Sequence, residues 1–376
     1  MTMPVRQAKP LRTRTPRIAR GVLACALACT LGAALGLGGC ATASENGAPK
    51  AATATATKSF TSMDTAMAVT VHASDQVAAD DAAQACMERV RELDGLLDPG
   101  DAASEIARLN ESGGEALAVS SDVRALVEAA LDVAEKTDGA FDPTVYPVTS
   151  AWGFTSGEHR VPSLEELNAL VGRVGYDNAS VDEVAGTVTL AHSAQIDVGG
   201  VAKGFAADEL RTLLAKRGVT SALLDLGGNV TSIGSKPSGE PWKIGIANPD
   251  APDALAGAIE LSDATVSTSG AYQRFFVDGD GITRHHLIDP ATGYPAETDL
   301  VSASVIGPDG ARCDALSTAL YVMGLDRALE LWRHAEGDEA FEAVLIAQDG
   351  SVHVTAGIAD AFEAADAYAG KVVVER

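Results

Sequence analysis

The order of the expected strands and helices limits this chain to few folds, because the two do not alternate regularly. Apolar residues at helical spacing predict helices at 80–97, 119–136, 163–174, 201–217, 313–323 and 326–334. Short alternating or β-branched runs predict strands at 67–72, 180–184, 187–190, 222–226, 242–246, 301–306, 343–347 and 351–355, the last two as a hairpin. Without a repeating βαβ unit, this order favours an α+β fold with substantial sheet over a doubly wound fold.

The first 39 residues are a basic stretch followed by an apolar one. Residues 1–20 carry six Lys or Arg and no acidic residue, and residues 21–39 are apolar and rich in Gly and Ala. This order is typical of a secretory signal peptide. A transmembrane anchor is the alternative, because the apolar stretch approaches the about 20 residues that a span needs. Its many glycines and the lack of an aromatic belt disfavour a span.

The end of this segment, Leu37-Gly-Gly-Cys40, resembles a bacterial lipobox, in which the Cys is lipidated and becomes the N-terminus. Residues 1–39 are then a lipoprotein signal peptide, and Cys40 carries the lipid. Residues 40–58 are rich in Ala and Thr without an apolar period, which predicts a flexible tether. The domain is expected at 59–376. The protein is expected to be exported and held by its lipid on the outer face of the cell membrane.

The charge of the chain excludes one class of partner. The net charge is −24, and removal of residues 1–39 leaves 22 basic and 52 acidic residues, a net charge of −30. Nucleic-acid binding needs a basic face, so no nucleic-acid partner is expected. Two cysteines, Cys86 and Cys313, lie in the expected domain. Outside the cytoplasm they could form one disulfide, or they could be two small buried residues.

A carboxylate and a hydroxyl are spaced by one turn in the predicted helix 313–323. Asp314 and Thr318 are four residues apart, so their oxygens lie on one helix face. Such oxygens suit a hard cation such as Mg²⁺. A helix cap with a polar surface Thr would give the same pattern, so the pair alone is weak evidence for a metal.

A second segment, 197–204, reads DVGGVAKG and joins a strand to a helix. Its glycines allow a ligand to approach the backbone, and Lys203 at a helix start favours phosphate. A tight turn with a solvated Lys is an equally good interpretation. The segment is not a P-loop, because Gly204 follows the Lys where a P-loop has Ser or Thr.

Two further segments are rich in Gly, Asp and Thr: 139–144, and 268–270 followed by 286–293. Phe141 could line a ring pocket, but aromatic residues such as Trp152 and Phe154 are more often core residues. A single His such as His286 is more often structural than catalytic. The stretch 289–293 reads DPATG, which is first of all a turn.

Taken together and in this order, the segments resemble the ApbE family, the FAD:protein FMN transferases. The resemblance runs from about Met63 past Asp349. It rests on Met63, Ser104-Glu105-Ile106 with Asn110, Gly139–Thr144 with Pro147, Trp152 and Phe154, Asp197–Gly204, Gly227–Asn229 with Pro241-Trp242, Thr268–Gly270, His286–Pro295 and Asp314–Thr318.

The resemblance implies a fold with a flavin-binding cleft and a role for each matching residue. It implies that Asp314, Thr318 and the Gly200 carbonyl bind Mg²⁺. It implies that His286 lies near the transferred phosphate and assists proton removal, and that Lys203 and Asp314 also act in catalysis. The FAD contacts that it implies are Met63, Ala140, Phe141, Asp142, Asp197, Lys203 and Thr292.

Two positions depart from the family pattern. Gly100 stands where the family usually has an aromatic residue that packs on the isoalloxazine, so the stacking residue is undetermined. Ala271 stands where the family usually has Asp after Thr-Ser-Gly.

The implied activity is Mg²⁺-dependent transfer of FMN from FAD to a Thr or Ser hydroxyl of an exported or membrane flavoprotein, with release of AMP. Two alternatives stay open: an FAD pyrophosphatase, with water as nucleophile, and a flavin-binding lipoprotein without catalysis.

Overall fold

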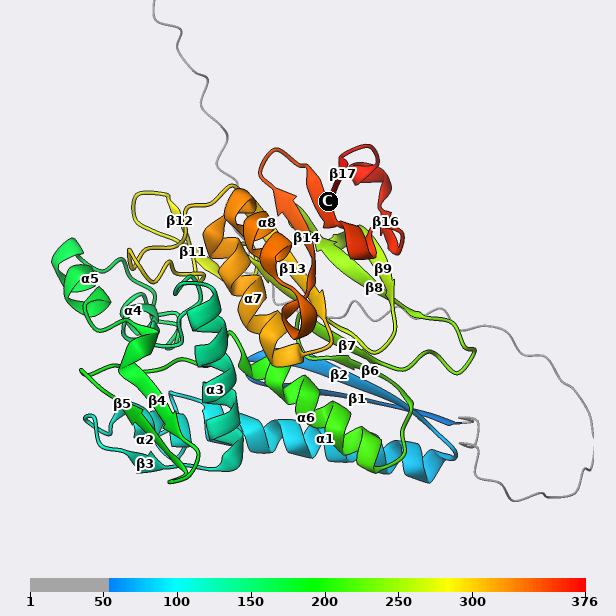
Figure 1. Cartoon of the computed structure of the whole chain (residues 1–376), viewed down its shortest axis with the longest axis horizontal. Coiled ribbons are helices and arrows are strands. Elements are labelled where there is room, and N and C mark those ends of the chain that lie inside the picture. The colour runs from blue at the N-terminus through cyan, green and yellow to red at the C-terminus, as the bar shows by residue number, and fades with distance from the viewer. Residues whose placement is uncertain (1–53) are drawn as a thin grey trace, which may run out of the picture. The chain divides into compact units, whose positions relative to one another are not determined.

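The computed structural model describes residues 54–376. Nine strands of this part form one sheet in the order β1-β2-β6-β7-β10-β13-β14-β15-β17, as Figure 1 shows. Every neighbouring pair is antiparallel except β15 and β17. The strands are β1 (Ala54–Ser62), β2 (Thr65–Ala73), β6 (Ser221–Asp225), β7 (Asn229–Ile233), β10 (Thr265–Gly270), β13 (Leu300–Gly307), β14 (Glu342–Ala347), β15 (Val352–Thr355) and β17 (Val372–Glu375). The expected α+β fold is confirmed.

The sheet begins earlier in the chain than the sequence predicts. The predicted tether, 40–58, overlaps β1, which starts at Ala54 and pairs with β2 along its whole length. Ala56 and Phe60 enter the core, and Thr side chains of β1 hydrogen-bond across to β2. The tether prediction is wrong for residues 54–58, because β2 supplies pairing partners that an Ala/Thr-rich segment does not reveal by itself. Residues 1–53, with the predicted signal peptide and Cys40, lie outside the described residues.

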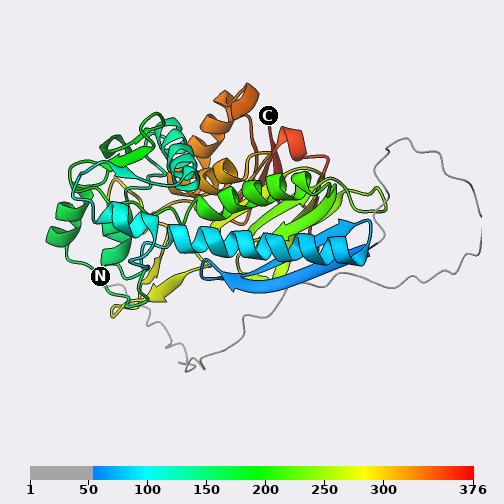
Figure 2. The same cartoon turned by 90° about the horizontal axis from the view of Figure 1, so that it is seen from below.

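Three helices cover one face of the sheet: α1 (Gln76–Leu97), α6 (Ala202–Lys216) and α7 (Gly310–Met323). Figure 2 shows α1 and α6 side by side along this face. Next to α7 lie α3 (Ser121–Lys136) and α8 (Leu325–His334). The main apolar core fills the space between these helices and the sheet.

A small antiparallel sheet packs on the opposite face. It consists of β8 (Trp242–Asn248), β9 (Ala251–Leu261) and β16 (Phe362–Ala364). Its Trp242, Ile244 and Ile259 form a second core with Ile306 and Val344 of the large sheet. The large sheet is therefore buried on both faces around β13 and β14, whereas alternate residues of β1 are exposed.

The remaining elements lie together at one end of the large sheet (Figure 1). They are α2 (Glu105–Asn110), α4 (Tyr146–Ala151), α5 (Leu164–Val171), the sheet β3 (Leu117–Ala118), β5 (Thr187–Leu190), β4 (Ala179–Asp182), and the hairpin β11 (Phe275–Val277) with β12 (Thr283–His285). Ser120 and Ser163 cap α3 and α5. Among residues 54–376, no helix is both long and apolar enough to cross a membrane.

Cys86 and Cys313 are both buried with free thiols, so of the two sequence alternatives the structure has two small buried residues. Burial raises the pKa of Cys86 to about 12 and also raises the pKa of Cys313.

Candidate functional site

The pair Asp314 and Thr318 of α7 faces the start of α6. Asp314 is only 6% exposed, and its Oδ2 accepts a hydrogen bond of 3.0 Å from the backbone N–H of Gly204. The Lys203 ammonium lies 3.9 Å from the same oxygen. This buried carboxylate therefore has one backbone donor and one cation beside it.

Gly200 connects this corner to the segment 139–144. A Cβ on Gly200 would lie 3.0 Å from the Phe141 ring and 3.8 Å from Thr318 Oγ1. Lys203 Nζ donates to the carbonyl of Gly199 at 3.2 Å. The structure thus brings together five of the predicted residues, from three separate segments: Phe141, Gly200, Lys203, Asp314 and Thr318. We call these five residues the acid corner.

Hydroxyl groups that the sequence analysis left without a role surround Thr318. Ser269 Oγ lies 3.1 Å from Thr318 Oγ1 and 2.8 Å from Ser317 Oγ. Ser317 Oγ in turn donates to the carbonyl of Asp314 at 2.8 Å. The Thr-Ser-Gly segment ends β10, and this network is what couples it to α7. The Thr-Ser-Gly motif marked this segment as a candidate part of the site. The contact between Ser269 and Thr318 joins residues 49 apart in the chain, so the sequence alone could not predict it.

Asn110 holds the loop that contains Asp197. Its side-chain amide accepts from the N–H of Ile196 at 2.6 Å and donates to the carbonyl of Ile196 at 2.9 Å. Asp197 follows directly, with its N–H donating to the Pro143 carbonyl at 2.7 Å and its Oδ1 accepting from Gly199 at 2.8 Å. The Asn of the Ser-Glu motif is therefore a positioning residue for the Lys203 loop.

The Asp142 side chain accepts hydrogen bonds from Thr144 and Tyr176. One carboxylate oxygen accepts from the N–H and hydroxyl of Thr144, at 2.8 and 2.6 Å, and the other accepts from the N–H of Tyr176 at 2.9 Å. Burial raises the pKa of Asp142, and these donors oppose the rise. Its side chain shapes the segment next to the buried Ala140 and Phe141.

His286 follows β12 and has a defined tautomer. Its Nδ1 lies 3.1 Å from the carbonyl oxygen of Arg274, which can only accept, so Nδ1 carries the proton and Nε2 is left with a lone pair. Burial lowers the pKa of His286 to about 3, and the positive charges of Arg274 and Lys203 add to this. The ring is therefore neutral at physiological pH, with one nitrogen able to accept a proton.

Met63 and Thr292 lie in turns of their own. Met63 stands at the β1–β2 turn with φ 47° and packs against the main core. Thr292 is exposed, and its hydroxyl donates to Asp289 at 2.9 Å. Gly100 is exposed and offers no side chain for stacking.

The acid corner suits a hard cation. Among residues 54–376, no group of three or more His, Cys, Asp or Glu side chains gathers at a metal distance. The acid corner instead offers one buried carboxylate and one hydroxyl, both oxygen donors. Mg²⁺ accepts such a set, because it keeps waters and shares substrate phosphates.

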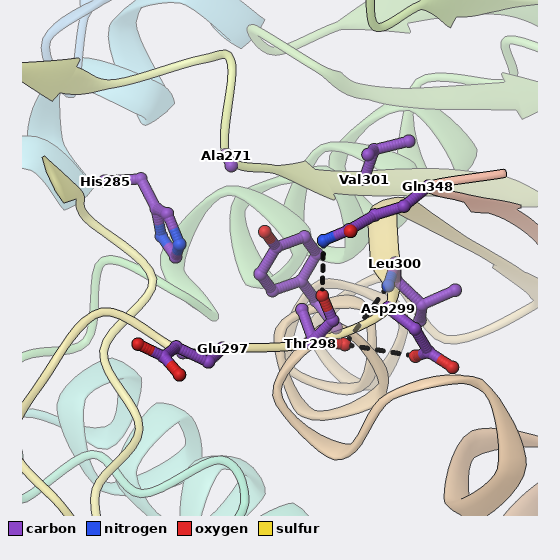
Figure 3. Close-up of a pocket in the computed structure, with 10 residues that line it drawn as sticks. Ala271, His285, Glu297, Thr298, Asp299, Leu300, Val301 and Gln348 are labelled. Atoms are coloured by element: carbon purple, nitrogen blue, oxygen red, sulfur yellow. Dashed lines mark hydrogen bonds between the residues drawn. The ribbon is translucent and has the colours of Figure 1, made fainter. Parts of the chain in front are cut away.

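A cavity of about 600 Å³ lies between the end of β10, β12 and α7, and none of the five acid-corner residues lines it. Figure 3 shows His285 and Ala271 on one side of it and Thr298 and Gln348 on the other. Tyr321, one turn after Thr318, also lines it.

Comparison with known proteins gives consistent results. The model of the ApbE family matches residues 63–343. An FAD:protein FMN transferase of Treponema pallidum is 37% identical over 289 residues, covering 73% of this chain and 78% of that protein. The enzyme of the same name from Escherichia coli K12 is 32% identical over 266 residues, covering 68% and 74%.

Solved structures agree. The ApbE protein of Thermotoga maritima superposes with a TM-score of 0.74 at 30% identity, covering 85% of this chain and 99% of that one. The flavinyl transferase ApbE of Pseudomonas stutzeri, in its apo form, gives 0.70 at 31% identity, covering 79% and 92%.

Proposed function

The chain belongs to the ApbE family, and we propose that it is an FAD:protein FMN transferase. It moves the FMN part of FAD to a Thr or Ser hydroxyl of an acceptor flavoprotein and releases AMP. The observation that carries the proposal is the acid corner, in which a buried carboxylate, an ammonium and a hydroxyl come together from two helices.

The reaction exchanges the phosphoanhydride bond of FAD for a phosphoester bond to the acceptor. The acceptor oxygen bonds to the FMN-side phosphorus, the bond from that phosphorus to the bridging oxygen breaks, AMP keeps that oxygen, and the hydroxyl proton is lost. Phosphoryl transfer of this kind depends on alignment and charge neutralisation. Lys203 supplies a positive charge close to Asp314, where it neutralises the diphosphate.

In this proposal His286 takes the hydroxyl proton at Nε2, which the Nδ1 contact with the Arg274 carbonyl supports by leaving Nε2 free to accept. Its low pKa makes it a weak base in the free protein. The negative charge of a bound diphosphate would oppose the contributions of Arg274 and Lys203, which are smaller than that of burial.

We further propose that Asp314, Thr318 and the Gly200 carbonyl hold Mg²⁺, which would neutralise the diphosphate oxygens. The all-oxygen donor set and the 6% exposure of Asp314 support this. Since Gly204 occupies Oδ2, the other carboxylate oxygen is the one available to a cation.

Mass spectrometry of acceptor proteins incubated with FAD, Mg²⁺ and the enzyme tests the function. One added FMN per acceptor, with equimolar AMP, is the expected result. Fast AMP release without an acceptor would instead indicate a pyrophosphatase. Bound FAD that stays intact with Mg²⁺ present would indicate a flavin-binding lipoprotein.

The N-terminal sequence supports a location for this activity. We propose that the protein is exported, cleaved before Cys40 and anchored in the membrane by lipid on that residue. Labelling cells with a radioactive fatty acid tests this, because Cys40→Ala should abolish incorporation and leave an uncleaved or soluble protein. Equal labelling of both forms would contradict the anchor.

A further inference from the structure

We propose that Asp208 of α6 is a positioning residue for Asp314, because it fixes the first turn of α7 against α6. This inference rests on the proposed function, in which Asp314 binds Mg²⁺, and it adds a residue outside the acid corner. The hydrogen bonds of Asp208 go to Arg211 and to the backbone of Gly310 and Ala311.

The helices α6 and α7 cap each other. The Gly204 N–H, in the first turn of α6, donates to Asp314 Oδ2 at 3.0 Å. At the start of α7, the Gly310 N–H donates to Asp208 Oδ1 at 3.0 Å and the Ala311 N–H donates to Asp208 Oδ2 at 2.9 Å. The first N–H groups of a helix have no partner within that helix and favour a negative charge. Each helix therefore supplies a carboxylate to the other.

The spacing of these contacts couples them. Gly204 and Asp208 are one turn apart in α6, and Gly310 and Asp314 are one turn apart in α7. The contacts pair the first residue of one couple with the second of the other, so the two helices run antiparallel here and are joined at two levels, about 5.4 Å apart along the axis. Because a helix is stiff over one turn, a shift at Gly310 moves Asp314 as well.

Asp208 is itself held in place by Arg211, which lies three residues further along α6. Arg211 Nη1 donates to Asp208 Oδ1 at 3.0 Å and to the Pro308 carbonyl, in the loop before α7, at 2.5 Å. Arg211 Nη2 donates to Thr265 Oγ1 at 3.3 Å. Thr265 begins β10, the strand whose Ser269 contacts Thr318. Asp208 and Arg211 thus join α6 to both elements that carry the remaining part of the acid corner.

The contacts of Asp208 require both carboxylate oxygens. Burial raises the pKa of Asp208 to about 6, although the Gly310 and Ala311 N–H groups and Arg211 oppose the rise. The carboxylate is therefore charged at about pH 8, and each oxygen accepts one α7 N–H. An amide at this position offers one acceptor oxygen only, and its NH₂ group would face the second N–H.

Asp208→Asn at about pH 8 tests the role, since the first turn of α7 should move away from α6 and displace Asp314. The Mg²⁺ concentration for half-maximal FMN transfer should rise about tenfold, the scale typical of residues that orient metal ligands. Calorimetric titration with FAD gives a second readout that needs no turnover. The affinity at saturating Mg²⁺ should fall about fivefold, and the affinity without Mg²⁺ should stay within about twofold of wild type.

Asp309→Asn is the matched control, because it removes the same charge next to the same helix start. Asp309 is exposed, and its Oδ1 alone caps α7 by accepting from the Arg312 N–H at 2.9 Å. Asn caps a helix about as well as Asp, so both readouts should stay within about twofold of wild type.

A cap that only stabilised α7 would lower the unfolding temperature of Asp208→Asn and leave the Mg²⁺ requirement of the folded protein at the wild-type value. That result would overturn the positioning role, as would equal changes in Asp208→Asn and Asp309→Asn. Asp208→Glu keeps the charge and both oxygens and decides the matter if the Asn variant does not fold. Its longer side chain should raise the Mg²⁺ requirement about threefold, and a wild-type requirement would overturn the role.

The two readouts keep this inference separate from the transferase function. Wild-type protein that binds FAD more tightly with Mg²⁺ but labels no acceptor would contradict the transferase function alone, because the calorimetric comparison of the variants still decides the role of Asp208. Wild-type binding of FAD that ignores Mg²⁺ would overturn both the metal assignment and the role of Asp208.

Discussion

Gly204 of α6 and Gly310 of α7 are packed backbone against backbone. A Cβ on Gly204 would clash with the Gly310 carbonyl, and a Cβ on Gly310 would lie 2.5 Å from the Gly204 carbonyl oxygen. This close approach lets the Gly204 N–H reach Asp314, one turn further along α7. The acid corner therefore depends on two residues without side chains.

Gly204→Ala should force α6 and α7 apart. We expect a loss of about 3 kcal/mol or more in unfolding free energy, because overpacking of this kind displaces backbone, together with loss of transfer activity. Thermal unfolding and AMP release measure the two effects. Gly95→Ala is the matched control, since nothing lies within 4 Å of its Cβ position in α1. It should stabilise by about 0.5–1 kcal/mol. Equal behaviour of the two variants would contradict the helix contact.

Thr318→Val should weaken the response to Mg²⁺. The substitution keeps the shape of the side chain but removes the hydroxyl that Ser269 holds at 3.1 Å. The Mg²⁺ concentration for half-maximal transfer should rise at least tenfold, about 1.4 kcal/mol. Thr318→Ser keeps the hydroxyl and should stay within threefold of wild type. If the Val variant saturates at the wild-type Mg²⁺ concentration, the metal assignment fails.

Asn110→Ala should loosen the 197–204 loop. Both hydrogen bonds to Ile196 are lost, so the buried N–H and carbonyl groups are left unpaired. We expect a higher KM for FAD and a loss of about 2 kcal/mol in stability. Asn110→Asp keeps the acceptor for the Ile196 N–H and should be intermediate. Calorimetric titration with FAD distinguishes the variants, and an unchanged affinity in Asn110→Ala would count against the positioning role.

His286 should make stability fall at low pH. Its folded pKa of about 3 lies below the ordinary value of 6.5, so the unfolded chain binds the proton more tightly. The stability is intact above about pH 6.5 and declines as the pH falls toward 3, by on the order of 2 kcal/mol after allowance for the partly exposed ring. Denaturant unfolding across this range should show a shallower decline in His286→Gln. Parallel curves would mean that His286 titrates normally.

The sequence by itself indicated which residues to look for in the candidate site. The resemblance of its ordered segments to the ApbE family singled out Lys203, Asp314 and Thr318 as candidates, and helix periodicity placed the last two on one face. Helix spacing also predicted most helices to within a few residues, because an apolar period is a local signal.

Tertiary structure alone decided which groups meet. Ser269 and Thr318 are 49 residues apart, and Gly204 and Asp314 are 110 apart. β1 exists because β2 pairs with it, not because Ala and Thr favour a strand there. Local sequence patterns do not predict these long-range partners, because the pairing and packing energies arise only when distant segments come together.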